Sequence, residues 1–301
     1  MAKRRVRARH AAPVHILPVL ILRVALGLVL SYVVLVAVAW LFQERLAFPA
    51  PRAPVPDPPR VGVANGEKIE LVMKDGTRLA GWYLKPVEVS GASTILHHPP
   101  QPAQPAPALL WFYGNGENIA TIWPIVRDFQ PPHAALLIVD YPGYGGSAGR
   151  ATEAGMYGAS DAVYAALAAR PEVDPHRIFV YGRSLGTAAA TYTATHHPVA
   201  GVILESPFTS AADMARHAYR IFPSFIVRLS LDNLARIRQV RCPVLLFHGT
   251  GDRLVPLEMG MRIAAAAAGP VELVLLQGSG HNESYAIGGT QYRDKVWGFV
   301  R

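Results

Sequence analysis

The chain has 301 residues, which is enough for a membrane anchor and one sizeable α/β domain. Its hydrophobic content of 51% and mean hydropathy of +0.20 are high for a soluble protein and indicate a membrane segment. Of the net charge of +8, +5 lies in the first ten residues, so the remaining +3 argues against a nucleic-acid-binding protein. The single cysteine, Cys242, neither requires nor excludes an oxidising compartment.

The N-terminal region predicts a membrane anchor. Residues 1–13 form a basic tail, and residues 14–42 are almost wholly apolar, with Arg23 as the one charged residue. A stretch of this length suffices to cross a hydrocarbon core at about 1.5 Å per residue, and Arg23 can extend its charge to the interface. The positive charges before the span predict a cytoplasmic N-terminus and an extracytoplasmic remainder.

A cleaved signal peptide is the alternative interpretation of the same region. Ala37-Val38-Ala39 resembles an A-x-A cleavage site. The apolar run is long for a signal peptide, however, and continues through Phe42. We therefore favour an uncleaved anchor.

Residues 43–66 read as a proline-rich linker. Six prolines lie between Pro49 and Pro59 and predict an extended, semi-rigid spacer between the bilayer and the next domain. A second proline-rich segment, Gly91–Ala108, contains His97 and His98 and is expected to be a surface loop. We expect no metal site at the histidine pair, because no carboxylate or cysteine lies next to it.

Residues 67–301 predict one α/β domain with a mostly parallel central sheet and helices on both faces. A hairpin, Lys68–Met73 and Leu79–Leu84, comes first. Apolar strands are then expected at Leu109–Tyr113, Ala134–Val139, Arg177–Tyr181, Val199–Leu204, Pro243–His248 and Val271–Leu276, and helices at Ile119–Phe129, Glu153–Ala169, Leu185–His196, Glu258–Ala268 and Arg293–Val300. Continuous apolar strands that alternate with helices indicate a parallel sheet covered on both sides.

One stretch combines a strand, a tight turn and a helix. Gly182-Arg183-Ser184-Leu185-Gly186 fits G-x-S-x-G between the strand ending at Tyr181 and the alanine-rich helix. This context predicts that Ser184 lies on a sharp turn, with its hydroxyl exposed above the sheet and helix N–H groups nearby. An ordinary glycine-flanked turn is the alternative.

A serine nucleophile needs a base and an acid that orients the base. Asp252 and His281 lie in glycine-rich loops directly after predicted strands, in the order that G-x-S-x-G enzymes use. Ligands bind at the carboxyl ends of strands in such sheets, so these three residues should meet there. Glu205, which ends another strand, is the rival acid, and Asp252 as a simple turn former is the remaining alternative.

Acyl transfer also requires hydrogen-bond donors for the developing oxyanion. One predicted donor is the backbone N–H of Leu185. The other is the backbone N–H of Asn115, in the glycine-containing loop Gly114–Asn118 after a strand. An ordinary loop with a helix cap at Asn118 is compatible with this role.

Five spaced motifs together resemble the α/β-hydrolase superfamily: Tyr113–Gly116, Asp140–Ser147, Gly182–Gly186, His248–Asp252 and Gly280-His281. The resemblance covers the chain from Glu67 onward and is greatest to a membrane-anchored branch described as serine aminopeptidase-like or prolyl-oligopeptidase-like. It implies a catalytic triad of Ser184, Asp252 and His281, with Leu185 and Asn115 as oxyanion donors. Tyr113 departs from the pattern, because many relatives have His there, and the Asp140 motif is loosened by Pro142 and an extra glycine.

Residues 206–241 are expected to form a small cap-like connection. Apolar residues spaced as in short amphipathic helices alternate there with six arginines. One interpretation is an apolar cap with a basic rim that faces anionic lipid or an acidic substrate. A crossover helix with a solvated face is the other.

The resulting hypothesis is a membrane-anchored serine hydrolase that acts on an ester, thioester or amide of a small or lipid-like acyl substrate. A non-catalytic envelope scaffold and an acyltransferase are the alternatives. The sequence implies no metal, organic cofactor or nucleic acid, and it does not define the oligomeric state.

Overall fold

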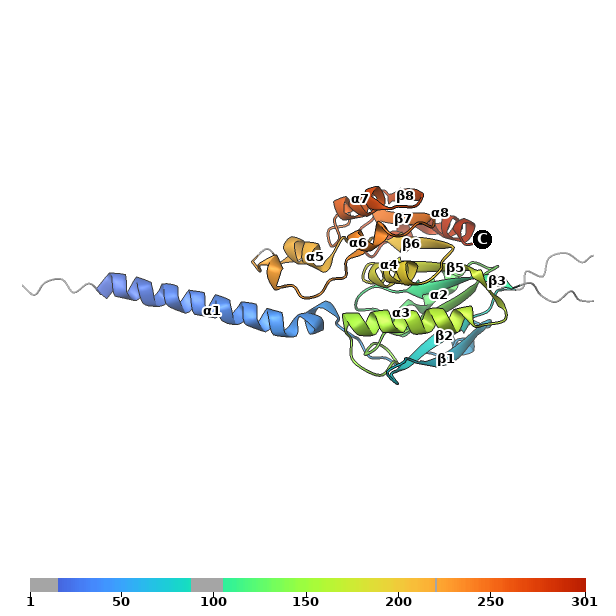
Figure 1. Cartoon of the computed structure of the whole chain (residues 1–301), viewed down its shortest axis with the longest axis horizontal. Coiled ribbons are helices and arrows are strands. Elements are labelled where there is room, and N and C mark those ends of the chain that lie inside the picture. Colours follow the sequence, from blue (N-terminus) through green and yellow to red (C-terminus); the bar gives the residue numbers. More distant parts are fainter. Residues whose placement is uncertain (1–15, 88–104, 220) are drawn as a thin grey trace, which may run out of the picture. The chain divides into compact units, whose positions relative to one another are not determined.

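The computed structural model describes residues 16–87, 105–219 and 221–301 (Figure 1). The chain divides into two compact units, Met1–Phe42 and Gln43–Arg301. The predicted basic tail and the pair His97 and His98 lie outside the described residues.

The N-terminal apolar region forms the helix α1 (Ile16–Ala47). Within it, Pro18–Ala47 is long and apolar enough to span a membrane, with a mean hydropathy of 2.6 over its most apolar 18-residue window, although a signal sequence would meet the same criteria. The helix extends past the predicted end at Phe42, because Glu44, Arg45 and the residues after them are good helix formers. Pro49 cannot continue it.

In the described part of the second unit, Gln43–Arg301, eight strands form one sheet. They are β1 (Gly66–Val72), β2 (Arg78–Leu84), β3 (Ala106–Phe112), β4 (Ala135–Val139), β5 (Val173–Arg183), β6 (Gly201–Glu205), β7 (Val244–Gly249) and β8 (Val271–Leu276). Their order is β1-β2-β4-β3-β5-β6-β7-β8. The hairpin β1–β2 and the pair β2–β4 are antiparallel, and the other neighbours are parallel.

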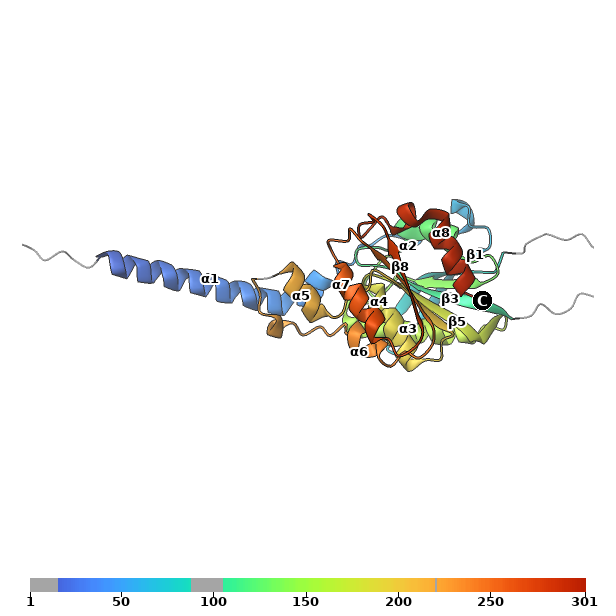
Figure 2. The same ribbon diagram turned by 90° about the horizontal axis from the view of Figure 1, so that it is seen from above.

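Helices cover both faces of this sheet (Figure 2). α2 (Ile119–Phe129) and α8 (Ser284–Phe299) pack together on one face; α3 (Glu153–Ala168), α4 (Gly186–His196), α6 (Asn233–Ile237) and α7 (Leu257–Ala266) follow one another across the other. The central strands are therefore buried on both sides, which explains their continuous apolar sequences. The predicted α/β-hydrolase architecture is confirmed.

Several predicted boundaries differ from the structure, most of them by one to a few residues. β3 begins at Ala106, so the end of the predicted surface loop Gly91–Ala108 is a strand. β5 extends through Arg183, so a charged residue continues the strand up to the turn. The last helix begins at Ser284 instead of Arg293, with a kink at Gly289. The adjacent glycines Gly288 and Gly289 have low helix propensity and concealed its first half.

The proline-rich stretch, expected as an extended, semi-rigid spacer, instead packs against the rest of the second unit. Phe48, Val55 and Val63 are buried in the core. The carbonyl of Pro51 accepts a hydrogen bond from the N–H of Gly145 at 2.8 Å, and that of Pro56 accepts one from the Trp82 indole at 2.9 Å. Prolines donate no hydrogen bond, but their carbonyls accept, so the stretch packs as a strap without joining the sheet. η1 (Pro59–Val61), a single 3₁₀ turn, lies near its end.

The described residues of the connection 206–241 form short helices. They are α5 (Ala211–Ala218), η2 (Ser224–Ile226) and α6. This connection follows the carboxyl end of β6, so it begins at the edge of the sheet where β5, β7 and β8 also end.

Burial of the strap predicts that its core residues contribute to the free energy of unfolding. Replacement of Phe48 by Ala should lower the free energy of unfolding by about 3 kcal/mol, because it removes a core aromatic side chain. The matched control is Phe225→Ala, since Phe225 is 86% exposed and its loss should be almost neutral. Urea unfolding of the full chain in detergent, followed by tryptophan fluorescence, measures both. Equal stability of the two variants would contradict the packed strap.

Candidate active site

Ser184 lies on a strained turn between β5 and α4. Its φ of 49° is in the left-handed region, which non-glycine residues rarely adopt. The flanking glycines have no room for a side chain: a Cβ on Gly182 would lie 2.4 Å from the carbonyl oxygen of Gly186, and one on Gly186 would lie 2.2 Å from that of Phe112. This crowding explains the glycines on both sides of Ser184.

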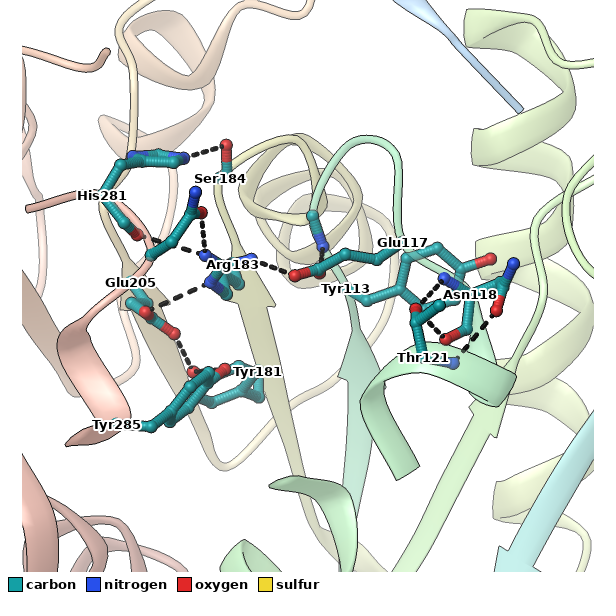
Figure 3. A network of polar contacts seen from close by, with 12 residues as sticks. Tyr113, Glu117, Asn118, Thr121, Tyr181, Arg183, Ser184, Glu205, His281 and Tyr285 are labelled. Carbon is teal, nitrogen blue, oxygen red and sulfur yellow. Dashed lines mark hydrogen bonds and ion pairs between the residues drawn. The ribbon is translucent and has the colours of Figure 1, made fainter. Parts of the chain in front are cut away.

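His281 lies between Ser184 and Asp252. Its Nε2 is 2.9 Å from Ser184 Oγ (Figure 3). Its Nδ1 is 2.7 Å from Asp252 Oδ2. The three residues follow β5, β7 and β8, whose parallel arrangement puts their carboxyl ends at one edge. The structure therefore brings together the three side chains that the sequence singled out.

The Asp252 carboxylate is buried and well supplied with donors. Its Oδ1 accepts hydrogen bonds from the N–H groups of Leu254 at 3.0 Å and Val255 at 2.9 Å. Burial acts to raise its pKa, but the hydrogen bond and charge of His281, together with the Val255 N–H, outweigh burial and lower the pKa. Asp252 thus remains an anion that accepts a hydrogen bond from Nδ1 of His281.

His248, which the sequence placed inside a strand, is a buried core residue. Its Nε2 is 2.9 Å from the carbonyl oxygen of Val255, and burial lowers its pKa. A neutral His248 donates that hydrogen bond from Nε2 and stabilises the turn that presents Asp252.

The two backbone N–H groups that the sequence singled out as oxyanion donors have no hydrogen-bond partner in the part of the chain that the structure describes. Among the described residues, no hydrogen bond uses the N–H of Leu185 or of Asn115. Leu185 precedes the first turn of α4. The Asn115 side chain is held on both sides, since its Nδ2 donates to the carbonyl of Ala47 at 2.8 Å and its Oδ1 accepts from Tyr144 at 2.9 Å.

Arg183, which sequence reasoning overlooked, connects the loops of the site. Its guanidinium is buried and pairs with Glu205 at 3.3 Å and also with Glu117 (Figure 3). It also donates to the carbonyl of His281 at 3.1 Å and to Asn282 at 2.7 Å. Burial opposes its charge, but Glu205 above all raises its pKa, so it stays protonated.

Glu117 extends this network to the loop that carries Asn115. Its Oε2 accepts a hydrogen bond from the N–H of Gly114 at 2.7 Å. Arg183 therefore holds the loops of His281 and Asn115 at the same time. The sequence contained a feature that could have indicated this pair, because Arg183 and Glu205 are charged residues at the ends of two successive apolar strands. In the structure they lie opposite each other in the register of β5 and β6.

Glu205, the rival acid, has a different environment from Asp252. Besides Arg183, its carboxylate accepts hydrogen bonds from the hydroxyls of Tyr181 and of Tyr292, the latter at 3.3 Å. Burial raises the pKa of both tyrosines well above the ordinary value, so they remain neutral donors. In the structure, Glu205 forms an ion pair with Arg183, and Asp252 accepts the hydrogen bond from His281.

Tyr113 and Asp140 support the loops behind the site. The Tyr113 hydroxyl donates to Asp140 Oδ1 at 3.2 Å and accepts from the N–H of Tyr141 at 2.9 Å. Asp140 also accepts from the N–H groups of Ile119 and Gly146, each at 2.9 Å. The tyrosine that departs from the family pattern is thus a supporting residue.

Comparisons with known proteins agree with this fold. A family model described as "Serine aminopeptidase, S33" matches residues 103–235. An uncharacterised protein of Mycobacterium tuberculosis (strain H37Rv) is 33% identical over 264 residues, which cover 87% of this chain and 88% of that protein. Human alpha/beta hydrolase domain-containing protein 17B is 34% identical over 164 residues, 54% of each chain. An esterase structure from Pyrococcus furiosus has a TM-score of 0.65 at 17% identity and covers 83% of this chain and 98% of its own.

The buried ion pair predicts a large asymmetry between single and double variants. Arg183→Met leaves the Glu205 carboxylate buried without its cation and should cost about 3–5 kcal/mol of unfolding free energy. Arg183→Met combined with Glu205→Leu should recover part of this loss, because apolar residues replace a buried pair at little cost.

Arg127→Met is the matched control, since Arg127 pairs with Asp128 at the surface and should change stability by less than about 1 kcal/mol. Urea unfolding of the full chain in detergent measures all variants. An Arg183→Met variant as stable as Arg127→Met would show that the buried pair of Arg183 and Glu205 does not stabilise the fold.

Proposed function

The chain belongs to the α/β-hydrolase superfamily, and on this basis we propose that it is a serine hydrolase that cleaves an ester, thioester or amide. Family membership and the esterase likeness support a hydrolase. The single observation that carries the serine mechanism is the position of the His281 ring, within 3 Å of both partners: 2.9 Å from Ser184 Oγ and 2.7 Å from Asp252 Oδ2.

The proposed reaction begins with proton transfer. His281 Nε2 takes the Ser184 hydroxyl proton as the oxygen attacks the substrate carbonyl. The anionic carboxylate of Asp252 stabilises the resulting imidazolium through Nδ1. The tetrahedral intermediate then collapses, His281 protonates the leaving group, and an acyl-enzyme remains on Ser184. Water, deprotonated by His281, hydrolyses the acyl-enzyme and regenerates the serine.

The proposed oxyanion donors are the N–H groups of Leu185 and Asn115. No described residue uses them, which leaves both available to a substrate oxygen. The strained φ of Ser184 supports this role, because it turns the serine onto the N-terminal end of α4, where the helix dipole favours negative charge.

Among the possible substrates, an acyl ester is the class that we favour, because the fold neighbour is an esterase. An aminopeptidase would need an acidic group for a free amino terminus, and the sequence offers no clear candidate. We also propose that α1 anchors the enzyme, because the positive charges precede the span. The N-terminus would be cytoplasmic, and the unit Gln43–Arg301, which we call the catalytic unit, would lie outside. The substrate would then be small or lipid-like.

Two alternatives have distinct outcomes. A non-catalytic scaffold would fold but fail to react with a fluorophosphonate. An acyltransferase would form the acyl-enzyme but pass the acyl group to an alcohol or amine in preference to water. Product analysis with competing acceptors separates transfer from hydrolysis.

Loss of the nucleophile provides the first functional test. Ser184→Ala should abolish fluorophosphonate labelling and lower kcat on a p-nitrophenyl ester by on the order of 10⁴–10⁶. The test uses esters of graded chain length on the full chain. Ser160→Ala, a buried serine of α3, is the control and should keep full labelling. Labelling that persists in Ser184→Ala would disprove the nucleophile assignment.

The acid is tested by a second pair of variants. Asp252→Asn should lower kcat by about 10⁴, because the amide no longer holds the imidazole in the reactive tautomer. Asp161→Asn is the matched control: Asp161 lies 2.7 Å from His197, so this variant also alters an aspartate–histidine contact, but one formed between α3 and the end of α4. Equal kcat values for the two variants would exclude Asp252 from catalysis.

A further inference from the structure

The C-terminal turns of α1 form part of the catalytic unit. The compact unit begins at Gln43, directly after the apolar stretch that ends at Phe42. Within this unit, the carbonyl of Ala47 accepts the hydrogen bond from the Asn115 side chain at 2.8 Å. A hydrogen bond therefore joins the loop that carries Asn115 to Ala47, the last residue of α1.

Gln43 also holds the connection between β6 and β7. Its Oε1 accepts hydrogen bonds from the N–H of Arg228 at 2.6 Å and of Leu229 at 3.4 Å, and its Nε2 donates to the carbonyl of Ile226 at 3.4 Å. One side chain thus satisfies three backbone groups of an irregular segment. Gln43 directly follows the apolar stretch that ends at Phe42, so only its side chain separates this segment from the end of that stretch.

Glu153, at the start of α3, holds the same segment from its other side. Its carboxylate accepts hydrogen bonds from the N–H of Ser230 at 2.9 Å and of Leu231 at 2.8 Å. Gln43, Glu153 and Tyr157 line a pocket of about 460 Å³ beside residues 228–230. Residues 226–231 are therefore held by Gln43 at their first part and by Glu153 at their end.

The residues just before this segment present aromatic side chains to the outside. Phe225, in η2, is 86% exposed, and Tyr219, at the end of α5, is 59% exposed. We call these two residues the cap surface. Leu254, in the neighbouring loop of Asp252, is also exposed at 52%. The Arg253 carbonyl of that loop lies 3.2 Å from His217 Nε2 in α5, so the cap surface and the loop of the acid are adjacent.

We propose that the cap surface inserts into the headgroup region of the bilayer that holds α1, and that anionic lipid is its partner. The proposal rests on the membrane anchor proposed above. Aromatic side chains favour the membrane–water interface. Six arginines against two aspartates give residues 206–241 a net charge of +4, which complements anionic headgroups.

The bilayer is the partner that the geometry favours over a protein. An inserted α1 brings lipid to within reach of Gln43 in every copy of the enzyme, because the two are covalently linked. Two exposed aromatic residues form a surface too small for a stable protein interface. Since the Asn115 loop and the cap surface share one edge of the sheet, Ser184 then opens toward the lipid surface.

The test uses the full chain in nanodiscs of phosphatidylcholine and phosphatidylglycerol. The background variant is Cys242→Ser, which removes the single cysteine. Phe225→Cys, labelled with an environment-sensitive fluorophore, should be quenched several-fold more by doxyl-labelled phospholipid than Val87→Cys. Val87 is 47% exposed and follows β2 at the opposite edge of the sheet.

A third label, at Val29→Cys in α1, reports whether the anchor is inserted. Quenching at Val29 but no more quenching at Phe225 than at Val87 would overturn the proposal. Absence of quenching at Val29 would show that α1 is not inserted in the bilayer, which would also disprove the proposal. A Phe225 label shielded from aqueous iodide but not quenched by lipid would mean that a protein covers the surface, which also disproves the proposal. None of these readings depends on hydrolysis, so they stand or fall apart from the assignment of Ser184.

Discussion

The buried pair of Arg183 and Glu205 is the interaction on which the rest of the site depends. The two residues end adjacent parallel strands, and the guanidinium reaches from this pair to the His281 carbonyl and to Glu117. A buried cation is tolerated only when its N–H groups find anionic or carbonyl partners. The buried charge of Arg183 is therefore satisfied only when the loops of His281 and Asn115 are both in place. Its contacts hold these two loops next to the turn of Ser184.

A second constraint comes from the N-terminal side of the catalytic unit. The end of α1 and the strap of prolines after it contact β2, the Asn115 loop and the connection between β6 and β7. The segment that follows the apolar stretch therefore packs against the loops of the candidate site. In our proposal this arrangement gives one edge of the sheet two tasks, catalysis and contact with lipid, and it leaves the opposite edge away from the bilayer.

Several features could be predicted from the sequence because their causes are local. The helix Ile119–Phe129 and the strand Val271–Leu276 have the predicted bounds, since apolar periodicity and flanking turn residues mark them. Asp252 and His281 were found because each follows a strand in a glycine-rich loop. The spacer failed as a prediction because proline content indicates an extended backbone but does not reveal that Phe48, Val55 and Val63 fill the core.

By itself the sequence determined the strand–turn–helix around Ser184, the α/β class and the order of the candidate triad residues, since these follow from side-chain periodicity and from glycines at a crowded turn. Only the tertiary structure decided that Asp252, and not Glu205, lies beside His281, and that Arg183 joins the loops. The physical reason is that such contacts link residues far apart in the chain. Their distances depend on how the whole sheet and its helices pack, and neighbouring residues in the sequence carry no record of that.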